Sequence, residues 1–395
     1  MSAFKVCDGI YSVGVPDHDR RLFDELIPLP DGTSYNSYLV KGNEKTALID
    51  TVYLPRMNQL LLNLKKVGVN RLDYIISNHS EGDHSGSIPK LLELHPECMI
   101  VTNKKCKEML IDSLHVPDEK FIVIEDGQEL DLGGKTLEFM ITPWVHWPDT
   151  MVTYLREDRI LFTCDLFGSH LSPYNPLEPM PDKIEAAAKR YYAEIMMPFR
   201  AIIRKHMERI RRLDIRMVAP SHGPVHMPPD QIFSLYDDWI SDRVKNEAVI
   251  PYVSMYGDTL AMVDRLSEAL TERGISVRPF NITKTDIGEL AMALVDAATV
   301  VIGAPTVLAG PHPSALYVAT IMNALRPKTR FLSFFGSYGW GGRAVEIIKA
   351  ATSGMGAEFL EPVLVKGYPT EDDRSIEDLA GRIAAKHRDI GILKP

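Results

Sequence analysis

The densest group of chemically active residues lies at residues 78–86, NHSEGDHSG, which holds two imidazoles and two carboxylates within one short stretch. His79 and Glu81 are two positions apart, so on an extended segment their side chains point the same way. Asp83 and His84 follow where the chain is expected to turn into a helix, and they can face a second ion. A solvated polar turn would explain any one of these residues. Four of them directly after an apolar strand favour a site for two metal ions.

Three further donors lie at the ends of predicted strands. Asp165 closes an apolar strand, where a carboxylate is costly unless it is paired or metal-bound, so it is expected to bridge two ions. His146 is flanked by Trp and Pro, and a hydrogen-bonded core histidine would also explain it. His222 directly follows its strand and is preferred over the more distant His226. The predicted sets are His79, Glu81 and His146 for one ion and Asp83, His84 and His222 for the other, with Asp165 between ions ~3.5–4 Å apart.

Alternating strands and helices are expected to position these donors. Apolar periodicity predicts helices at 55–67 and 104–114, with the strand 72–77 delivering the first donors. Residues 15–33 are rich in Pro and charge and are expected to form an exposed loop. The polar stretch 237–247 is expected to be helical.

From residue 248 onwards, strand and helix patterns alternate five times, which predicts a doubly wound parallel sheet. Ligands of such sheets bind at the carboxyl ends of the strands. Three loops at those ends, 254–259, 304–310 and 336–342, have suitable residues. The predicted ligand-binding residues are Ser254, Met255, Tyr256, Gly257, Asp258, Thr259, Pro305, Thr306, Val307, Ser337, Tyr338, Gly339, Trp340 and Gly341.

The chemistry of these loops indicates a flat mononucleotide, FMN. The first loop opens a helix, so its amides and hydroxyls can hold a phosphate, with Asp258 expected to point outward. The other two loops offer small residues for close approach and aromatic rings for a planar head group. No GxGxxG follows the first strand, which disfavours a dinucleotide. Ordinary tight turns remain the alternative explanation.

Length and composition indicate a globular protein of two domains, 1–246 and 247–395. The net charge of −9 argues against a general nucleic-acid binder. No apolar run reaches the length of a membrane span, and no secretory signal is visible, so a cytoplasmic location is expected. The four cysteines lie far apart and form no CxxC pair, which argues against a disulfide framework.

The order of HSEGDHSG, His146, Asp165 and the SHG at 221–223 resembles the metallo-β-lactamase superfamily, whose usual first motif is HxHxDH. Glu81 stands in place of the second histidine, which resembles the flavodiiron proteins, or A-type flavoproteins. A harder oxygen ligand also shifts a nitrogen-rich site towards iron. Residues 248–395 resemble flavodoxin. The resemblance therefore implies an αββα metallo-β-lactamase-like sandwich followed by a flavodoxin-like domain, in the minimal two-domain form.

This resemblance implies a non-haem diiron centre supplied with electrons by FMN. The implied reactions are four-electron reduction of dioxygen to water, which is favoured, and reduction of nitric oxide to nitrous oxide. Rubredoxin or a reduced deazaflavin is the implied donor, and a head-to-tail homodimer, possible also as a tetramer, is the implied assembly. Tyr191 matches a family tyrosine near the substrate pocket, and Asp50 matches a residue that orients a ligand. Asp24 stands where some members carry a pocket histidine after phenylalanine.

Two other functions would also account for parts of this sequence. The first is a hydrolase with two zinc ions and a bridging hydroxide, with the flavodoxin-like unit serving as a docking module. The second is an electron-transfer flavoprotein with a vestigial first domain, which the complete set of metal donors disfavours. Metal content together with the visible spectrum would separate all three.

Overall fold

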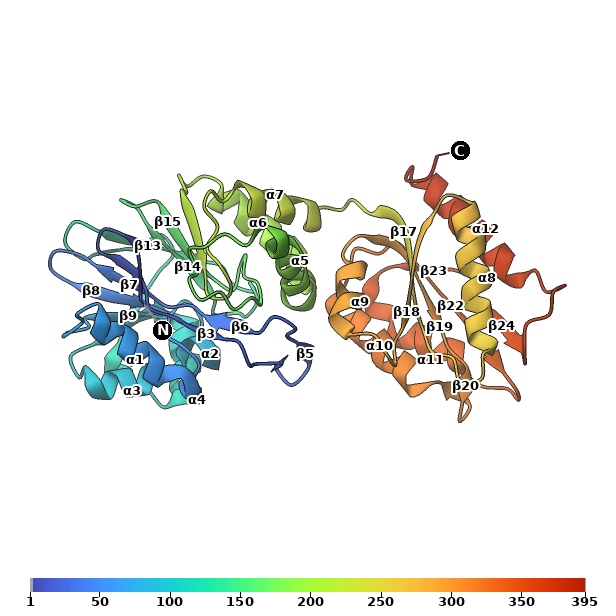
Figure 1. The fold of residues 1–395 in the computed structure, drawn as a ribbon, viewed down its shortest axis with the longest axis horizontal. Coiled ribbons are helices and arrows are strands. Elements are labelled where there is room, and N and C mark those ends of the chain that lie inside the picture. The colour runs from blue at the N-terminus through green and yellow to red at the C-terminus, as the bar shows by residue number, and fades with distance from the viewer. Residues whose placement is uncertain (1–2, 395) are drawn as a thin grey trace. The chain divides into compact units, whose positions relative to one another are not determined.

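The computed structural model describes residues 3–394, which divide into two compact units (Figure 1). The first unit consists of Met1–Tyr192 and Phe199–Ile240, and the second of Ala193–Pro198 and Ser241–Pro395. The domain boundary predicted between 246 and 247 lies close to Ser241. No helix within residues 3–394 combines the length and the hydropathy that crossing a membrane would require.

The first unit is built on two sheets. Strands β8, β9, β10 and β11 of the seven-stranded sheet run parallel to one another, whereas its other neighbouring strands pair antiparallel. In spatial order this sheet contains β1 (Phe4–Cys7), β2 (Ile10–Ser12), β7 (Tyr38–Lys41), β8 (Thr46–Ile49), β9 (Tyr74–Ile76), β10 (Met99–Asn103) and β11 (Phe121–Ile124). The five-stranded sheet contains β12 (Glu129–Asp131), β13 (Thr136–Ile141), β14 (Met151–Leu155), β15 (Ile160–Cys164) and β16 (Met217–Pro220).

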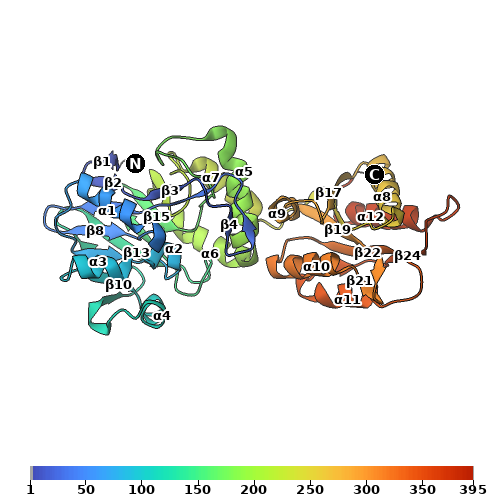
Figure 2. The same cartoon turned by 60° about the horizontal axis from the view of Figure 1, so that its bottom comes forward.

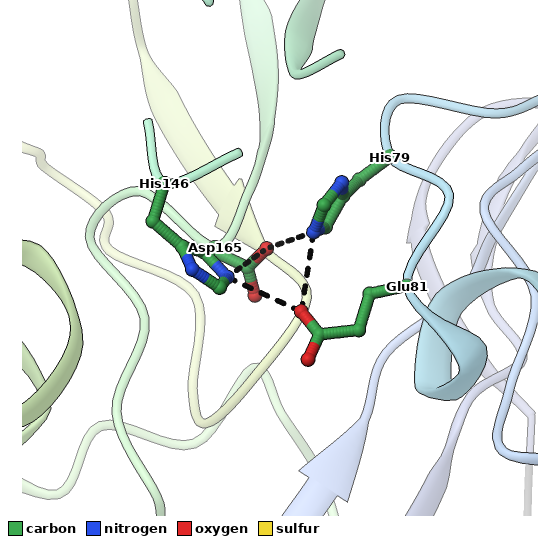
Figure 3. A group of neighbouring side chains, drawn as sticks. All are labelled: His79, Glu81, His146 and Asp165. Atoms are coloured by element: carbon green, nitrogen blue, oxygen red, sulfur yellow. Dashed lines mark hydrogen bonds and ion pairs between the residues drawn. The ribbon is translucent and has the colours of Figure 1, made fainter. Parts of the chain in front are cut away.

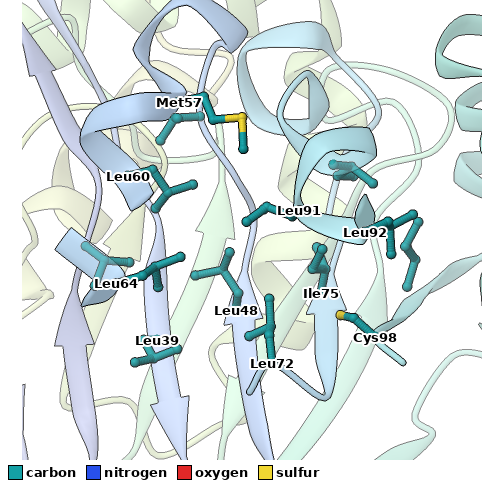
Figure 4. Packing of buried hydrophobic residues seen from close by; sticks show 14 of the residues in the cluster. Leu39, Leu48, Met57, Leu60, Leu64, Leu72, Ile75, Leu91, Leu92 and Cys98 are labelled. Atoms are coloured by element: carbon teal, nitrogen blue, oxygen red, sulfur yellow. The ribbon is translucent and has the colours of Figure 1, made fainter. Parts of the chain in front are cut away.

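The central strands of the larger sheet are buried on both faces. Leu39, Leu48 and Ile75 pack under helices on the outer face (Figure 4). Their neighbours Ile49 and Ile76 belong to the core between the two sheets, as the two-residue period of a strand requires. The helices of the outer face are α1 (Met57–Lys66), α3 (Ile88–Leu94) and α4 (Lys104–Leu114).

Helices α5 (Pro181–Tyr191), α6 (Arg200–Ile210) and α7 (Asp230–Trp239) lie on the side of the five-stranded sheet that faces away from the larger sheet (Figures 1 and 2). This arrangement is the αββα sandwich that the resemblance implied, and the predicted fold class is confirmed.

Two expectations for local structure in this unit were wrong. Residues 15–33 form short strands rather than a loop: β3 (Val15–Asp17) pairs with β6 (Thr33–Tyr35), and β4 (Leu22–Phe23) pairs with β5 (Ile27–Pro28). Val15, Phe23 and Ile27 are buried, and this apolar content is what holds the segment against the unit.

Only the start of the helix expected at 237–247 is helical, because these residues form the end of α7, which stops at Trp239. Its buried residues Ile232, Tyr236 and Trp239 have the three- to four-residue spacing of one helix face. The polar residues that follow already belong to β17 (Lys245–Tyr252), where Lys245 pairs with Ala297 of the neighbouring strand.

The second unit is a parallel sheet in the order β18-β17-β19-β22-β23, with β24 also pairing with β22. Numbered along the chain, this is the 2-1-3-4-5 order of flavodoxin-like folds, so the predicted doubly wound sheet is confirmed. The strand expected at 358–365 is split into two short strands. The remaining strands are β18 (Ser276–Asn281), β19 (Ala297–Gly303), β22 (Phe331–Tyr338), β23 (Glu358–Phe359) and β24 (Val363–Lys366).

Helices cover both faces of this sheet (Figure 2). On one face, α8 (Asp258–Glu272) and α12 (Ser375–Asp389) pack through Leu266 and Ile383. The other face is covered by α9 (Ile287–Leu294), α10 (Pro313–Leu325) and α11 (Ala344–Ala351). Leu290 of α9 and Ile348 of α11 are among the residues that these helices bury.

Candidate functional site

The first group of donors lies where β9, β13 and β15 end. Glu81 Oε2 lies 3.1 Å from His79 Nε2 and 3.2 Å from His146 Nε2 (Figure 3). Asp165 Oδ2 lies 3.9 Å from His79 Nε2 and 3.7 Å from His146 Nε2. Two imidazoles and two carboxylates therefore converge on a space that one cation could fill.

The second group lies on the other side of Asp165. Asp83, in the short helix α2 (Gly82–Ser85), places Oδ1 3.3 Å from His84 Nε2 and Oδ2 3.2 Å from His222 Nε2. Asp165 Oδ1 lies 3.0 Å from His84 Nε2 and 3.5 Å from His222 Nε2. The two oxygens of Asp165 thus face different groups, which is the geometry of a carboxylate bridging two ions.

The structure brings all seven predicted donors together, in the two groups that their positions at strand ends had suggested. His226, which was judged peripheral, lies outside both groups. His226 forms an isolated antiparallel β-bridge with Val218, and its Nε2 lies 2.9 Å from the carbonyl oxygen of Phe167.

Two of the imidazoles are held in orientation by a partner at Nδ1, the ring nitrogen that does not face the other donors. His79 Nδ1 lies 3.1 Å from a carboxylate oxygen of Asp149, and His222 Nδ1 donates a hydrogen bond to the carbonyl oxygen of Ser34 at 2.6 Å. In each ring Nε2 is left facing the donors. Carboxylate or carbonyl partners of this kind fix the tautomer of metal-binding histidines.

The chemistry of the donor set fits metal ions. Both carboxylate oxygens of Asp83 are buried, and they face imidazole nitrogens without forming well-aligned hydrogen bonds, so the carboxylate needs a nearby positive charge. Burial would raise the pKa of Asp165, but His84 and His222 hold it well below its usual range. Burial would lower the pKa of His79, but its bonds to Asp149 and Glu81 raise it well above its usual value. Without metal, imidazolium groups therefore compensate the buried carboxylates.

The two residues proposed to assist the centre both lie close to it. Tyr191, at the end of α5, donates a hydrogen bond to Asp165 Oδ1 at 2.8 Å. Burial and the Asp165 carboxylate raise the pKa of Tyr191 well above its ordinary value, so the phenol keeps its proton. Asp50 accepts hydrogen bonds from the backbone and side-chain nitrogens of Asn78 at 2.8 and 2.9 Å. Asp50 therefore fixes the position of Asn78, the residue directly before His79.

Sequence reasoning missed Asp149 and His170. His170 is fully buried, and its ring packs against Tyr191 and His222 with centroids 4.8 and 5.3 Å away. Its Nδ1 lies 3.0 Å from Thr33 Oγ1, while Nε2 has no hydrogen-bond partner among the described residues. The only signal for Asp149 in the sequence was an acidic residue directly after Pro148, three positions from His146. His170 lies in an irregular segment, where spacing gives no such signal.

Asp24 lies in the hairpin of β4 and β5, whose Phe23 ring packs against His170 and His222. Partial burial raises the pKa of Asp24, and the nearby carboxylates of Glu81 and Asp83 raise it further. The position predicted to replace a family pocket histidine is thus close to the donors, and His170 supplies an imidazole to the same region.

In the second unit, a cavity of about 270 Å³ opens at the carboxyl ends of β17, β19 and β22. The first two of these are where the strand order of the sheet reverses, the usual ligand position in such folds. Nine predicted residues line it: Met255, Tyr256, Asp258, Thr259, Pro305, Thr306, Ser337, Tyr338 and Gly339. Gly367 also lines the cavity and was not predicted, because it follows the short strand β24.

Five predicted cofactor-binding residues do not line this cavity: Ser254, Gly257, Val307, Trp340 and Gly341. Ser254 Oγ instead accepts a hydrogen bond from the backbone of Leu260, and Gly257 adopts a φ of 104° before α8. Asp258, which was expected to point outward, is the first residue of α8 and is one of the residues that line the cavity.

Comparison with known proteins covers both units. Residues 33–223 match the family described as ODP family β-lactamase, and residues 250–379 match flavodoxin. These two matches follow the order of the two units along the chain.

Similar proteins extend over nearly the full chain. The coenzyme F420H2 oxidase of Methanothermobacter marburgensis is 34% identical, over 98% of this chain and 99% of its own. The nitric oxide reductase of Moorella thermoacetica is 34% identical, over 97% and 98%. The structure of rubredoxin oxygen:oxidoreductase from Desulfovibrio gigas superposes with a TM-score of 0.94 at 29% identity, covering 98% and 99%. The flavodiiron protein of Giardia intestinalis gives 0.91 at 26% identity, covering 99% and 98%.

Proposed function

This chain belongs to the flavodiiron family, and from that premise we propose a function for its two sites. It is an oxidoreductase that reduces dioxygen, nitric oxide or both at a diiron centre supplied by FMN. The observation that carries this conclusion is the position of Asp165, whose two oxygens face two groups of nitrogen and carboxylate donors. We propose that His79, Glu81 and His146 hold one iron, that Asp83, His84 and His222 hold the other, and that Asp165 bridges them.

When bound, two ferrous ions and reduced FMN together supply the four electrons that convert dioxygen to water, or the two that couple two nitric oxide molecules to nitrous oxide. The residues of the chain set the conditions for this chemistry. Asp149 and the Ser34 carbonyl keep Nε2 of His79 and His222 directed at the donors. Tyr191 holds Asp165 through its hydroxyl and keeps its proton available beside the centre. Five of the seven donors are buried, which limits the access of bulk water.

The cavity of the second unit supports FMN as its ligand. Thr259 and Ser337 bring hydroxyls within 3.5 Å of each other at the N-terminal end of α8, where a phosphate is favoured. Tyr256 and Tyr338 offer aromatic surface for a planar ring system. We propose that the phosphate lies beside Thr259 and the ring system beside the tyrosines.

The electron donor and the assembly are also proposals. Rubredoxin and reduced deazaflavin are the candidate donors, because relatives named for each resemble this chain over nearly its full length. A head-to-tail homodimer, or a tetramer formed by two such dimers, would cover the loops around the flavin cavity. Tyr256 and Leu308 in those loops are 90% and 89% exposed, an apolar surface that a partner could bury. A cytoplasmic location is supported by four cysteines that are all free.

The function is tested on anaerobically purified protein loaded with iron and FMN. Two irons and one flavin per chain are expected, with chemically reduced protein consuming dioxygen or nitric oxide and releasing no peroxide from dioxygen. The Asp165→Ala variant is expected to lose bound iron and gas consumption while keeping its flavin spectrum. Zinc in place of iron, or wild-type gas consumption by Asp165→Ala, would contradict the proposal.

A further inference from the structure

Cys164 is a potential metal ligand that lies beside the donors and has no role in the proposed diiron centre. It closes β15 directly before Asp165 and is buried. In a regular strand these two neighbours would point to opposite faces. Cys164 instead has a φ of 52°, in the left-handed region, and its Sγ lies 3.5 Å from Asp165 Oδ2.

A third cluster of potential ligands results from this turn. One ligand atom each from His84, Cys164 and Asp165 lies within 4.8 Å of the other two. His84 also has a buried Nδ1 with no hydrogen-bond partner among the described residues. In a tetrahedral zinc site with Zn–S of about 2.3 Å and Zn–O of about 2.0 Å, sulfur and oxygen are about 3.5 Å apart. The contact between Cys164 and Asp165 already has that length.

We propose that Cys164, with His84 and Asp165, forms an alternative thiolate-containing site at which soft divalent cations such as zinc or cadmium displace iron from the centre. Unlike either proposed iron position, this site includes a sulfur ligand. Thiolate ligands select zinc and cadmium over ferrous iron, which the carboxylate-rich sets favour. The same bridging carboxylate cannot serve both arrangements, so occupation by a soft cation excludes the complete diiron centre.

The ordinary function of such a cysteine would be that of a small buried hydrogen-bond donor to Asp165. In the metal-free chain the Cys164 thiol donates its proton towards Asp165 Oδ2 at 3.5 Å. A cation bound to the sulfur must therefore replace that proton and release it to solvent. Metal binding in which Cys164 stays a thiol gives no sulfur-to-metal signal, so the two roles are distinguishable.

The test uses metal-free full-length protein titrated anaerobically with Co²⁺ or Cd²⁺ and followed by absorption. We expect a thiolate-to-metal charge-transfer band in the wild type. It should be absent from Cys164→Ser and Cys164→Ala and retained in Cys106→Ser, which removes another buried thiol of the same unit. Zinc affinity of Cys164→Ser should fall at least about tenfold, the smallest loss usual for a partner of a metal site. Circular dichroism of each variant checks that it is folded.

Cobalt d–d absorption in the wild type without a thiolate band would overturn the inference, because metal would then bind without the sulfur. A band that survives in both Cys164 variants would overturn it as well. The inference takes its other donors from the proposed diiron centre, but the two can fail separately. Iron-loaded protein that reduces no gas would contradict the proposed function and leave the cobalt–thiolate result unaffected.

Discussion

The carboxylate of Asp149 lies 3.1 Å from Nδ1 of His79, while Nε2 of the same ring faces Glu81 at 3.1 Å. The backbone nitrogen of Ser80 also donates to Asp149 at 2.8 Å, so the carboxylate is fixed relative to the segment that presents His79 and Glu81. Asp149 thereby fixes the orientation of the His79 ring and the basicity of its Nε2, although Asp149 is not itself a proposed metal ligand.

Asp149→Asn is expected to weaken iron binding by about 10- to 100-fold, the usual effect of losing such a partner. The amide keeps the shape of the side chain but removes the charge that holds His79. Equilibrium dialysis of the metal-free protein against ferrous iron measures the loss. Asp8→Asn, an exposed aspartate paired with Lys5, is the control. Equal iron affinity of Asp149→Asn and wild type would refute the role of Asp149.

Glu81→His is expected to shift metal selection towards zinc. Replacement of the shared carboxylate by an imidazole recreates the nitrogen-rich HxHxDH pattern, which suits zinc better than iron. Metal-free protein reconstituted from equal amounts of Fe²⁺ and Zn²⁺ should then hold a larger zinc fraction and consume less dioxygen. Glu119→His, on an exposed turn, should keep the wild-type ratio. An unchanged ratio in Glu81→His would argue that Glu81 does not set the preference.

Tyr191→Phe removes the hydroxyl that donates to Asp165 Oδ1. Turnover is expected to fall roughly tenfold, the factor that corresponds to about 1.4 kcal/mol of hydrogen-bond energy, with iron content unchanged. Stopped-flow reoxidation of the reduced protein measures this rate. The neighbouring Tyr192→Phe, whose hydroxyl donates to the Trp239 carbonyl oxygen, should react at the wild-type rate. Equal rates in both variants would assign Tyr191 to packing.

Thr259→Val removes a buried hydroxyl from the N-terminal end of α8 without changing the size of the side chain. FMN affinity is expected to fall about tenfold if this hydroxyl binds the phosphate. Fluorescence titration of the flavin-free protein measures it. Thr271→Val, near the other end of α8, is the matched control because its hydroxyl donates to the Ser267 carbonyl oxygen. Wild-type affinity in Thr259→Val would place the phosphate elsewhere.

His387 makes the stability of the second unit depend on pH. Burial lowers its pKa from 6.5 to about 4, and its nitrogens contact Thr299 and Asn246. The unfolded chain therefore takes up a proton below pH 6.5 that the folded chain resists. The contribution of His387 to the free energy of unfolding is therefore fully present above pH 6.5 and is lost as the pH drops from about 6.5 to about 4.

His387→Gln is expected to reduce this loss, since glutamine bonds without titrating. Urea unfolding of the full chain at pH 7 and pH 5, followed by circular dichroism, compares the shift in midpoint. His115→Asn, at an exposed position with a φ of 55°, should shift as the wild type does. A shift of wild-type size in His387→Gln would exclude His387 as the cause.

The positions of the metal donors were predictable because each lies directly after an apolar strand or at a turn into a helix. Glu81 follows β9 of the larger sheet and Asp165 follows β15 of the smaller one, so these residues, distant in sequence, converge where strands of the two sheets end. The flavin cavity was predictable because the carboxyl ends of the adjacent parallel strands β17, β19 and β22 meet at one edge of their sheet. Gly367 was missed because two short strands stand where the pattern indicated one.

The residues that support the donors could not be predicted in this way. Asp149 and His170 lie in segments without regular periodicity, so their partners depend on how loops pack. The helix expected at 237–247 was wrong because Lys245 and Glu247 look like a solvated helix face, yet they extend a strand that is buried further along. In both cases tertiary contacts, which a local pattern does not contain, decide the structure.

The walls of the flavin cavity come from Met255, Thr306, Ser337 and Gly367, which lie at or just after the ends of four different strands of one sheet, β17, β19, β22 and β24. These strands are neighbours in the sheet but far apart along the chain, so an intermediate lacking any of them has no complete cavity. Free FMN would therefore stabilise the finished sheet over every partly assembled form. Acquisition of yellow colour would then mark the last step of maturation in this unit, and flavin supply would act on the yield of mature protein as well as on its redox chemistry.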